Sequence, residues 1–454
     1  MAKIAGQLTT QDVAAVAHWL AAKPLPANTK PLTALPPASP GAQRIDCGSA
    51  PLPDKATPAV AAPARPTTPL LAQGAYLARA GNCMGCHTAR GGTPFAGGRG
   101  IETPFGTVFS SNLTSDTATG IGSWSAADFW QAMHDGRSKD GRLLNPAFPY
   151  TSFTQVTRAD SDALFAYLQT LPPASQANTP HALRWPFGTQ SALAVWRALY
   201  FTPGVYQADA ARPAEWNRGA YLVRGLGHCG SCHTPRNALG ASNSGFDLAG
   251  GMIPMQNWYA PSLMSSLEAG VADWSPQDIA ALLKTGVSPR GSAAGPMAEV
   301  VRNSTQYLSS EDLGAMTGFL KSLPATSEAP RAEQAAQGAP SAAVSGIGAK
   351  LYETHCAQCH GDRGEGVRGA YPPLAQNRGV TLSDTSNLVQ MVLYGGFAPA
   401  TEGNPRPFGM PPFVLQLNDK STAAVLTYIR NAWGNRASQV TELEVNRARG
   451  PHAR

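Results

Sequence analysis

The sequence predicts an all-α fold in which small helical domains follow one another along the chain and are joined by Pro- and Ala-rich linkers. Three observations favour it. A Cys-x-x-Cys-His motif occurs three times, beginning at Cys83, Cys229 and Cys356, and these copies lie too far apart for a solenoid of short repeats. An amphipathic helical segment precedes each motif, and another follows it further along the chain. A length of 454 residues also suits about three domains.

Two kinds of helix recur with each motif. The leading helices, which precede the motifs, read "GAYLARAGNC" from Gly74, "GAYLVRGLGHC" from Gly219 and "GAKLYETHC" from Gly348. The closing helices follow polar capping residues and begin near Val156, Leu308 and Leu417. Each closing helix carries an aromatic residue at the same place, namely Tyr167, Phe319 and Tyr428. We expect these aromatic residues to pack between the two helices of each domain.

The domain boundaries follow from these repeats and from composition. The predicted domains span residues 70–200, 205–325 and 344–440. Residues 25–69 and 326–343 are rich in Pro or Ala and poor in apolar patterning, so we expect extended linkers there. Cys47, in the first linker, is expected to be a free thiol without a catalytic role.

Composition indicates a globular chain with long loops. Apolar residues make up 43% of the sequence and charged residues only 14%. The net charge of +6 is spread along the chain, which argues against nucleic-acid binding. No apolar run reaches the length of a membrane span. The first residues also lack the basic and apolar regions of a signal peptide.

The three motifs predict haem attachment because that chemistry needs every residue in them. Two thiols on one helical turn reach the two vinyl groups at one edge of a porphyrin, and the adjacent His supplies a nitrogen ligand to the iron. A redox dithiol does not need the His, and a zinc site needs four ligands rather than a half-site repeated at wide spacing. The sequence therefore predicts three covalently bound haem c groups (iron), each in a class I cytochrome c domain. The attachment residues are Cys83, Cys86, Cys229, Cys232, Cys356 and Cys359, and the proximal ligands are His87, His233 and His360.

Two methionines are predicted as the sixth, distal iron ligands. Met410 stands in "PFGMPPF" shortly before the third closing helix, and Met297 stands in "GPMAEVV" before the second. A Met can also simply fill a gap in a core. Here the position before the closing helix and the flanking Gly and Pro favour ligation, and a thioether opposite His raises the potential of a haem.

The first domain departs from this pattern. Phe148, in "NPAFPYTSF", stands where Met is expected, and a Phe side chain cannot ligate iron. Met133 and His134 lie upstream in "WSAADFWQAMHDG", where comparison with "WSPQDIAALLKTG" favours a core position for Met133 and a surface position for His134. Either residue could still be a substitute ligand, and a five-coordinate first haem is the remaining alternative.

The N-terminal residues 1–24 resemble a fourth closing helix. "LTTQDVAAVAHWLAAKP" begins at Leu8, carries Trp19 at the aromatic position, and follows Met1 at the offset by which Leu417 follows Met410. The alternatives are an ordinary N-terminal helix or the end of a further domain. In the second case Met1 is an internal residue of a longer reading frame, which we expect to encode a signal peptide and one more Cys-x-x-Cys-His motif.

The motifs and several longer stretches resemble the triheme cytochrome c subunit of membrane-bound bacterial dehydrogenases. These stretches start at Thr103 ("TPFGTVFSSNLTSDTATGIGSWS"), Glu215 ("EWNRGAYLVRGLGHCGSCHTPRNALGA"), Gly295 ("GPMAEVVRNSTQYLS") and Cys356 ("CAQCHGDRGEGV"), and the resemblance covers about residues 70–434. The group includes the cytochrome subunits of alcohol and gluconate dehydrogenases. It also includes the cytochrome partners of molybdenum hydroxylases for aldehydes, nicotinate and isoquinoline, to which "PAFPY" is closer.

The resemblance implies an electron-transfer subunit that is not an enzyme by itself. It implies a partner dehydrogenase subunit of the molybdenum or PQQ type, ubiquinone or a terminal oxidase as acceptor, and a place at the periplasmic face of the inner membrane. Two other functions stay open. One is a peroxidase at an open first haem, with His134 and Asp135 as the acid–base pair. The other is a periplasmic electron shuttle without a fixed partner.

Overall fold

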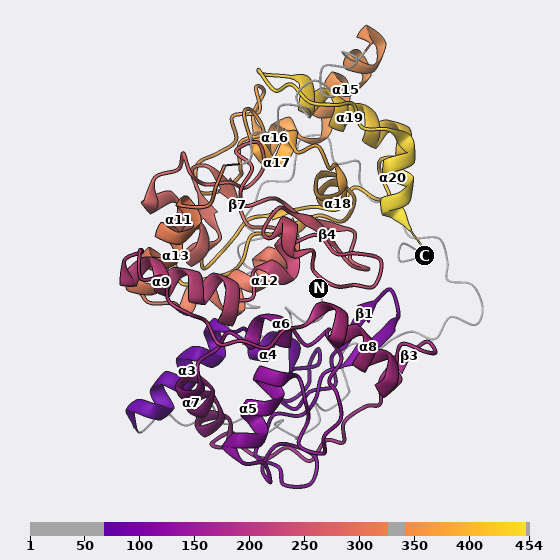
Figure 1. The fold of residues 1–454 in the computed structure, drawn as a ribbon. Helices are drawn as coiled ribbons and strands as arrows, with labels where there is room; N and C mark the ends of the chain where they lie inside the picture. Colours follow the sequence, from indigo (N-terminus) through magenta and orange to yellow (C-terminus); the bar gives the residue numbers. More distant parts are fainter. Residues whose placement is uncertain (1–67, 326–340, 451–454) are drawn as a thin grey trace, which may run out of the picture. The chain divides into compact units, whose positions relative to one another are not determined.

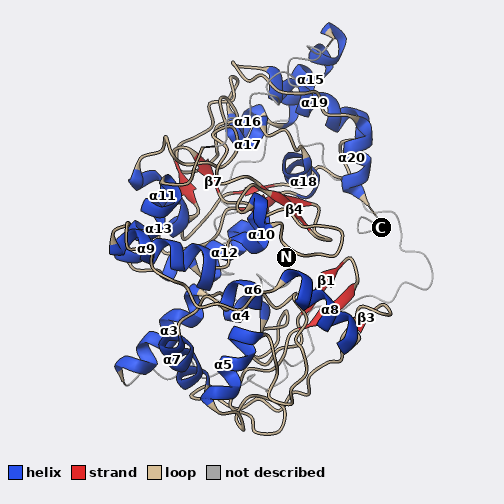
Figure 2. Ribbon diagram, viewed as in Figure 1, coloured by secondary structure: helices blue, strands red, loops and turns tan. Residues whose placement is uncertain are grey.

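The computed structural model describes residues 68–325 and 341–450, all of which belong to one compact unit, Val60–Arg454. We divide the described residues into a first segment (68–203), a second segment (204–325) and a third segment (341–450). The predicted N-terminal helix, with Met1, Leu8 and Trp19, lies outside the described residues, as does Cys47. Helices make up most of the ordered elements, and the strands are short (Figures 1 and 2).

The first segment begins with a leading helix and ends with a helix outside the repeat pattern. Its helices are α3 (Pro69–Ala80), α4 (Cys83–Cys86), α5 (Ala126–Asp135), α6 (Tyr150–Phe153), α7 (Arg158–Leu168) and α8 (Gln190–Tyr200). Strands β1 (Gly100–Thr103), β2 (Gly106–Phe109) and β3 (Ala182–Leu183) form an antiparallel sheet in that order. Helix α3 is the leading helix and α7 the closing helix.

The second segment repeats this plan. Its helices are α9 (Ala214–Ala220), η1 (Tyr221–Leu226), α10 (Gly230–His233), η2 (Ser244–Phe246), α11 (Pro276–Thr285), α12 (Gly295–Asn303), η3 (Thr305–Tyr307) and α13 (Ser310–Lys321). Two antiparallel hairpins join β4 (Gly251–Ile253) to β5 (Trp258–Ala260) and β6 (Val287–Ser288) to β7 (Gly291–Ser292). The leading helix is α9 with η1, and the closing helix is α13.

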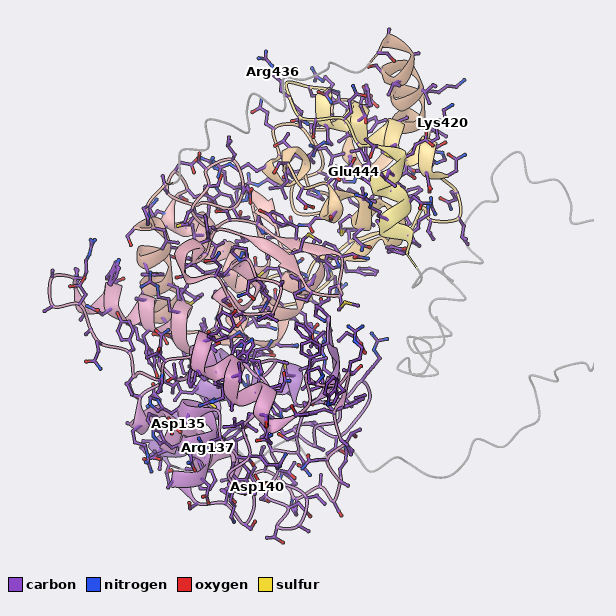
Figure 3. All side chains as sticks on the ribbon, turned by 45° about the vertical axis from the view of Figure 1, so that its right-hand side comes forward. Asp135, Arg137, Asp140, Lys420, Arg436 and Glu444 are labelled. Atoms are coloured by element: carbon purple, nitrogen blue, oxygen red, sulfur yellow. The ribbon has the colours of Figure 1, made fainter. Side chains whose placement is uncertain are left out.

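The third segment has the same leading and closing helices and one additional C-terminal helix. Its helices are α15 (Ala342–His355), α16 (Ala357–His360), α17 (Arg378–Thr381), α18 (Ser386–Tyr394), α19 (Asp419–Asn431) and α20 (Glu442–Arg449). Strands β8 (Gly396–Phe397) and β9 (Gly409–Met410) pair antiparallel. Helix α20 extends past residue 440, where the sequence predicts the domain to end. Its Glu444, labelled in Figure 3, accepts a hydrogen bond of 2.9 Å from the Thr385 hydroxyl.

Glycine in the leading helix allows it to touch the closing helix. A Cβ atom added to Gly74 would lie 2.0 Å from the carbonyl oxygen of Ala163, and one added to Gly219 would lie 2.0 Å from that of Ala315. At Gly348 the nearest atom, the carbonyl oxygen of Ala424, would lie 2.4 Å away. The aromatic residues of the closing helices are the next neighbours, with the Cβ atoms of Tyr167, Phe319 and Tyr428 at 2.7, 2.8 and 2.6 Å. The expected packing of these aromatic residues between the two helices is confirmed.

Side-chain caps explain where the closing helices begin. Thr157, Ser309 and Asn418 precede α7, α13 and α19, and each side chain accepts a hydrogen bond from a backbone N–H in the first turn. In the first two helices the N–H belongs to Asp160 or Asp312, which places both carboxylates at equivalent positions. Acidic residues are favourable in a first turn because the helix dipole is positive there.

The second leading helix contains a wide turn that the first lacks. The backbone N–H of Gly227 donates to the carbonyl of Leu222, five residues earlier, over 2.7 Å, so η1 is a π-helical turn. The sequence explains it, because "GAYLVRGLGHC" has one residue more between its Tyr and its Cys than "GAYLARAGNC".

The buried side chains form two apolar cores. The larger core contains residues from the first and second segments, among them Leu77, Leu164, Leu222 and Phe319. The smaller core lies within the third segment and includes Tyr352, Leu393 and Leu426. Within residues 68–325 and 341–450, no helix is both long and apolar enough to span a bilayer.

Candidate haem-attachment sites

Each Cys-x-x-Cys-His motif folds as one helical turn. The backbone N–H of the His donates to the carbonyl of the first Cys in all three motifs, over 2.9 Å from His87 to Cys83, 3.0 Å from His233 to Cys229 and 2.9 Å from His360 to Cys356. This i to i−4 bond places the two thiols of each motif on the same turn, directly before the His. The arrangement is the one that attachment to two neighbouring vinyl groups requires.

The six motif thiols are unpaired. None of Cys83, Cys86, Cys229, Cys232, Cys356 and Cys359 forms a disulfide. Burial, with a smaller contribution from the second Cys of the motif, raises the pKa of Cys83 and Cys229 to about 12 and that of Cys356 to about 11. A thiol with so high a pKa stays protonated at neutral pH and is a poor redox nucleophile. An uncharged thioether suits the same buried environment.

Each motif His is held by a backbone carbonyl. The Nδ1 atom lies 2.7 Å from the carbonyl oxygen of Ser111 for His87, 2.7 Å from that of Pro261 for His233, and 3.0 Å from that of Pro372 for His360. A carbonyl can only accept, so Nδ1 carries the proton and the lone pair of Nε2 is left for a metal. Burial lowers the pKa of all three rings, which keeps them neutral as iron ligation requires.

The motif residues fit a haem better than a metal ion held by protein alone. Over the described parts of the chain, no three His, Cys, Asp or Glu side chains gather in a group that could hold a metal ion. A haem iron needs one or two protein ligands, because the porphyrin supplies the other four. One ring nitrogen and two thiols per motif are the donor set that covalent haem c uses.

The two predicted distal methionines lie on elements that pack against a core. Met297 is on α12 and is partly buried against the larger core. Met410 is on β9, where Gly396 pairs with it, and is partly buried against the smaller core. Their role as sixth ligands stays a prediction.

The first segment has aromatic and apolar groups where the others have Met. Phe148 is partly buried against the larger core, and its ring lies 5.4 Å from that of Phe153. Met133 is a core residue with 6% of its surface exposed, as the sequence comparison favoured. His134 is half-buried rather than on the surface. Its ring stacks on Trp130 at 4.6 Å and its Nδ1 lies 2.8 Å from the Thr154 carbonyl.

Sequence reasoning missed an ion pair at the first motif. Arg99 donates to the carbonyl of Gly85, inside the motif, and pairs with Glu299 over 2.6 Å. Glu299 is on α12, two residues after Met297, so a side chain of the second segment reaches the first attachment site through Arg99. Nothing in the sequence indicates this pair, because its members are 200 residues apart and outside the repeated patterns.

Comparison with known proteins agrees with this chemistry. A cytochrome c family model matches residues 71–172 and 346–433. The chain is 39% identical over 383 residues to the cytochrome c subunit of alcohol dehydrogenase (quinone) from Gluconobacter oxydans (strain 621H), a match that covers 81% of this chain and 79% of that protein. It is 39% identical over 382 residues to the gluconate 2-dehydrogenase cytochrome c subunit of Pantoea cypripedii, covering 81% and 86%. It is also 41% identical over 388 residues to a subunit of nicotinate dehydrogenase from Pseudomonas putida, covering 83% of this chain but 32% of that longer protein.

Proposed function

Since the chain belongs to the family of cytochrome c subunits of bacterial dehydrogenases, we propose that it is a triheme c-type cytochrome that carries electrons away from a partner dehydrogenase. The observation that supports it most is the threefold recurrence of one local structure. Each motif presents two unpaired thiols on one turn and a His whose Nδ1 is held by a carbonyl. In this role the subunit transfers electrons and does not itself oxidise the substrate.

Within each site the chain attaches, orients and shields. The six motif Cys residues attach the haems, and His87, His233 and His360 direct Nε2 at the iron, with Met297 and Met410 as distal ligands of the second and third haems. When bound, each haem supplies a reversible one-electron carrier whose potential depends on its axial ligands. The carbonyl of Ser111, Pro261 or Pro372 fixes the ring orientation, because a His held at Nδ1 cannot turn away.

The relatives suggest the class of partner. They belong to dehydrogenases named for alcohol, gluconate and nicotinate, and the alcohol enzyme is named for a quinone. We therefore propose a catalytic subunit of the PQQ or molybdenum type that oxidises an alcohol, an aldehyde or an N-heterocycle. The acceptor is ubiquinone or a terminal oxidase, and the complex works at the periplasmic face of the inner membrane.

The peroxidase alternative gains no support from the first segment. Its acid–base pair would be His134 with Asp135, which ends α5 (Figure 3). The ring of His134 is instead stacked on Trp130 and hydrogen bonded to a backbone carbonyl. A distal catalytic His needs freedom to exchange protons with peroxide. Peroxide turnover by the isolated holoprotein would support the alternative.

Haem content tests the proposal. The chain is exported with a signal peptide and a haem-maturation system, and haem per chain is measured by pyridine haemochrome absorbance and intact mass. We expect three haems, and two in each of the variants Cys83→Ala, Cys229→Ala and Cys356→Ala, since a single thioether attaches haem poorly. Two or fewer haems in fully matured unmodified protein would contradict the proposal. Reduction of the haems by substrate in membranes that contain the partner dehydrogenase then tests electron transfer.

A further inference from the structure

A pair of Tyr–Asp hydrogen bonds is exchanged between the first and second segments. Tyr76 and Tyr221 occupy the same place in the "GAYL" pattern of the two leading helices. The hydroxyl of Tyr76 donates to Oδ2 of Asp312 in the second closing helix over 2.6 Å. The hydroxyl of Tyr221 donates to Oδ2 of Asp160 in the first closing helix over 2.5 Å. Each leading helix therefore binds the closing helix of the other segment.

The exchange extends to the helix caps. The Tyr76 hydroxyl accepts from the backbone N–H of Ser309, and the Tyr221 hydroxyl accepts from that of Thr157. Ser309 and Thr157 are the capping residues of the two closing helices. Both hydroxyls thus donate to an Asp and accept from a cap three residues before it. Such two-way contacts are the mark of an interface with twofold symmetry, here between two segments of one chain.

Each carboxylate also binds its own leading helix. Gln73 donates to Oδ1 of Asp160 over 2.7 Å, and Arg218 donates to both oxygens of Asp312 over 2.7 and 2.8 Å. Gln73 and Arg218 each directly precede the Gly of the pattern. Asp160 and Asp312 are 8% and 7% exposed, so both carboxylates are buried with their oxygens bonded. A buried carboxylate that loses a partner is costly, which makes each bond specific.

The same interface brings the first two attachment motifs together. The Ser304 hydroxyl donates to the carbonyl of Ala80, at the end of the first leading helix, over 2.9 Å. The ring of His228, directly before Cys229, meets that of Phe153 edge to face at 5.3 Å. The Cys86 and Cys232 thiols are close enough to interact electrostatically. Motif positions in the first two segments therefore depend on contacts across the interface.

The third segment cannot take part in this exchange. Lys350 stands in "GAKL" where the other leading helices have Tyr, and Ser421 stands where the other closing helices have Asp. A Lys cannot donate to Ser as a tyrosine does to a carboxylate within the same packing. The Tyr and Asp residues are shared by two of the three repeats and missing from the third.

We propose that Tyr76, Tyr221, Asp160 and Asp312 are positioning residues that lock the first two attachment motifs together as one two-haem unit, outside which the third motif stands. The inference rests on the proposed function, because it assumes that these motifs carry haem. Its consequence is that the first two haems keep one separation without any movement of domains. The two hydroxyls contribute through the geometry of the motifs and not by touching a haem.

The test uses the full holoprotein with Tyr76→Phe, Tyr221→Phe and both changes together. Phe keeps the ring and removes one hydroxyl. Two haems at close, fixed separation give a coupled, two-signed Soret circular dichroism signal. We expect each single variant to weaken this signal and the double variant to lose most of it, with haem content unchanged. Tyr394→Phe is the matched control, because its hydroxyl donates to the Ala448 carbonyl within the third segment. It should leave the signal unchanged.

The outcomes separate the two proposals. A double variant with three haems and the unmodified Soret signal overturns the positioning role. Fewer than three haems in the unmodified protein overturns the triheme function instead. A merely structural role would lower the melting temperature in the double variant and in Tyr394→Phe alike, whereas the positioning role changes the coupled signal in the first alone. The difference between the potentials of the first two haems is a second measurement and should shrink in the double variant.

Discussion

The first and second segments are joined in a way that the third is not. They share one apolar core and bury two carboxylates between their helices. The third segment has its own core and reaches the second through polar contacts, such as Arg378 to Asp273 at 2.7 Å and the two hydrogen bonds between Asn387 and the Tyr259 backbone at 2.8 and 2.7 Å. The comparison teaches that three copies of one helical plan differ in association because of a few side chains at fixed repeat positions.

The largest expected effect comes from closing the gap between leading and closing helices. A Val at Gly348 would put Cβ 2.4 Å from the Ala424 carbonyl, and a Val at Gly219 would put it 2.0 Å from that of Ala315. Such overpacking costs about 3 kcal/mol or more. We expect Gly348→Val to unfold the third segment and lose one haem, and Gly219→Val to affect the first two haems together.

Thermal unfolding followed by circular dichroism, with haem counting, measures the two variants. Gly318→Ala is the control, because a Cβ there meets nothing within 4 Å. Ala in a helix interior is more favourable than Gly by about 0.5–1 kcal/mol, so this variant should be slightly more stable. Loss of all haems in Gly348→Val would show that the third segment is not separate.

The next effect concerns the distal ligands. Met297→Ala and Met410→Ala should each lower the potential of one haem, within the about 0.8 V range over which axial ligands act, because a thioether stabilises ferrous iron. Redox titration and the Met–iron charge-transfer band near the red end of the spectrum measure this. Met133→Leu should change neither, since Met133 is a core residue. An intact band in both Ala variants would reject these ligands.

A smaller effect is expected from pH at the shared interface. Burial by itself raises the pKa of Asp312, but hydrogen bonds from Arg218 and Tyr76 outweigh it and hold the pKa below its ordinary value. Asp312 therefore stabilises the fold above the ordinary pKa of about 4, and this contribution is lost as the pH falls through its lower folded pKa. Asp312→Asn should cost about 1–3 kcal/mol at neutral pH and flatten the acid side of the stability profile. Urea unfolding from pH 7 to pH 3 measures both, and an unchanged acid slope would contradict the assignment.

The smallest effect is expected where the third segment meets the second. Asp273 pairs with Arg378, and the side chains are 50% and 26% exposed. Exposed ion pairs contribute about 0–1 kcal/mol and are screened by salt. Asp273→Asn should therefore change the melting temperature by little and leave the coupled Soret signal intact. A large loss of stability would show that the two kinds of interface are more alike than their contacts suggest.

Repetition made the helices and the attachment motifs predictable. The Gly of the leading helices, the aromatic residues of the closing helices and the thiol spacing are local or periodic features, and the structure has each in its expected place. The sequence also contained Tyr76 with Asp160 and Tyr221 with Asp312, but local patterns would pair residues within one repeat. The crossed pairing depends on which segments become neighbours. The Arg99–Glu299 pair was beyond reach for the same reason.

The π-helical turn at Tyr221–Leu226 shows how a repeat tolerates a change in length. The second leading helix has one extra residue between two points that cannot move, the hydroxyl bonded to Asp160 and the first thiol of the motif. A regular helix would rotate everything beyond the extra residue by about 100°. The wider turn takes up that residue in place, so insertions at this point are absorbed by the helix and do not disturb the spacing of the residues around it.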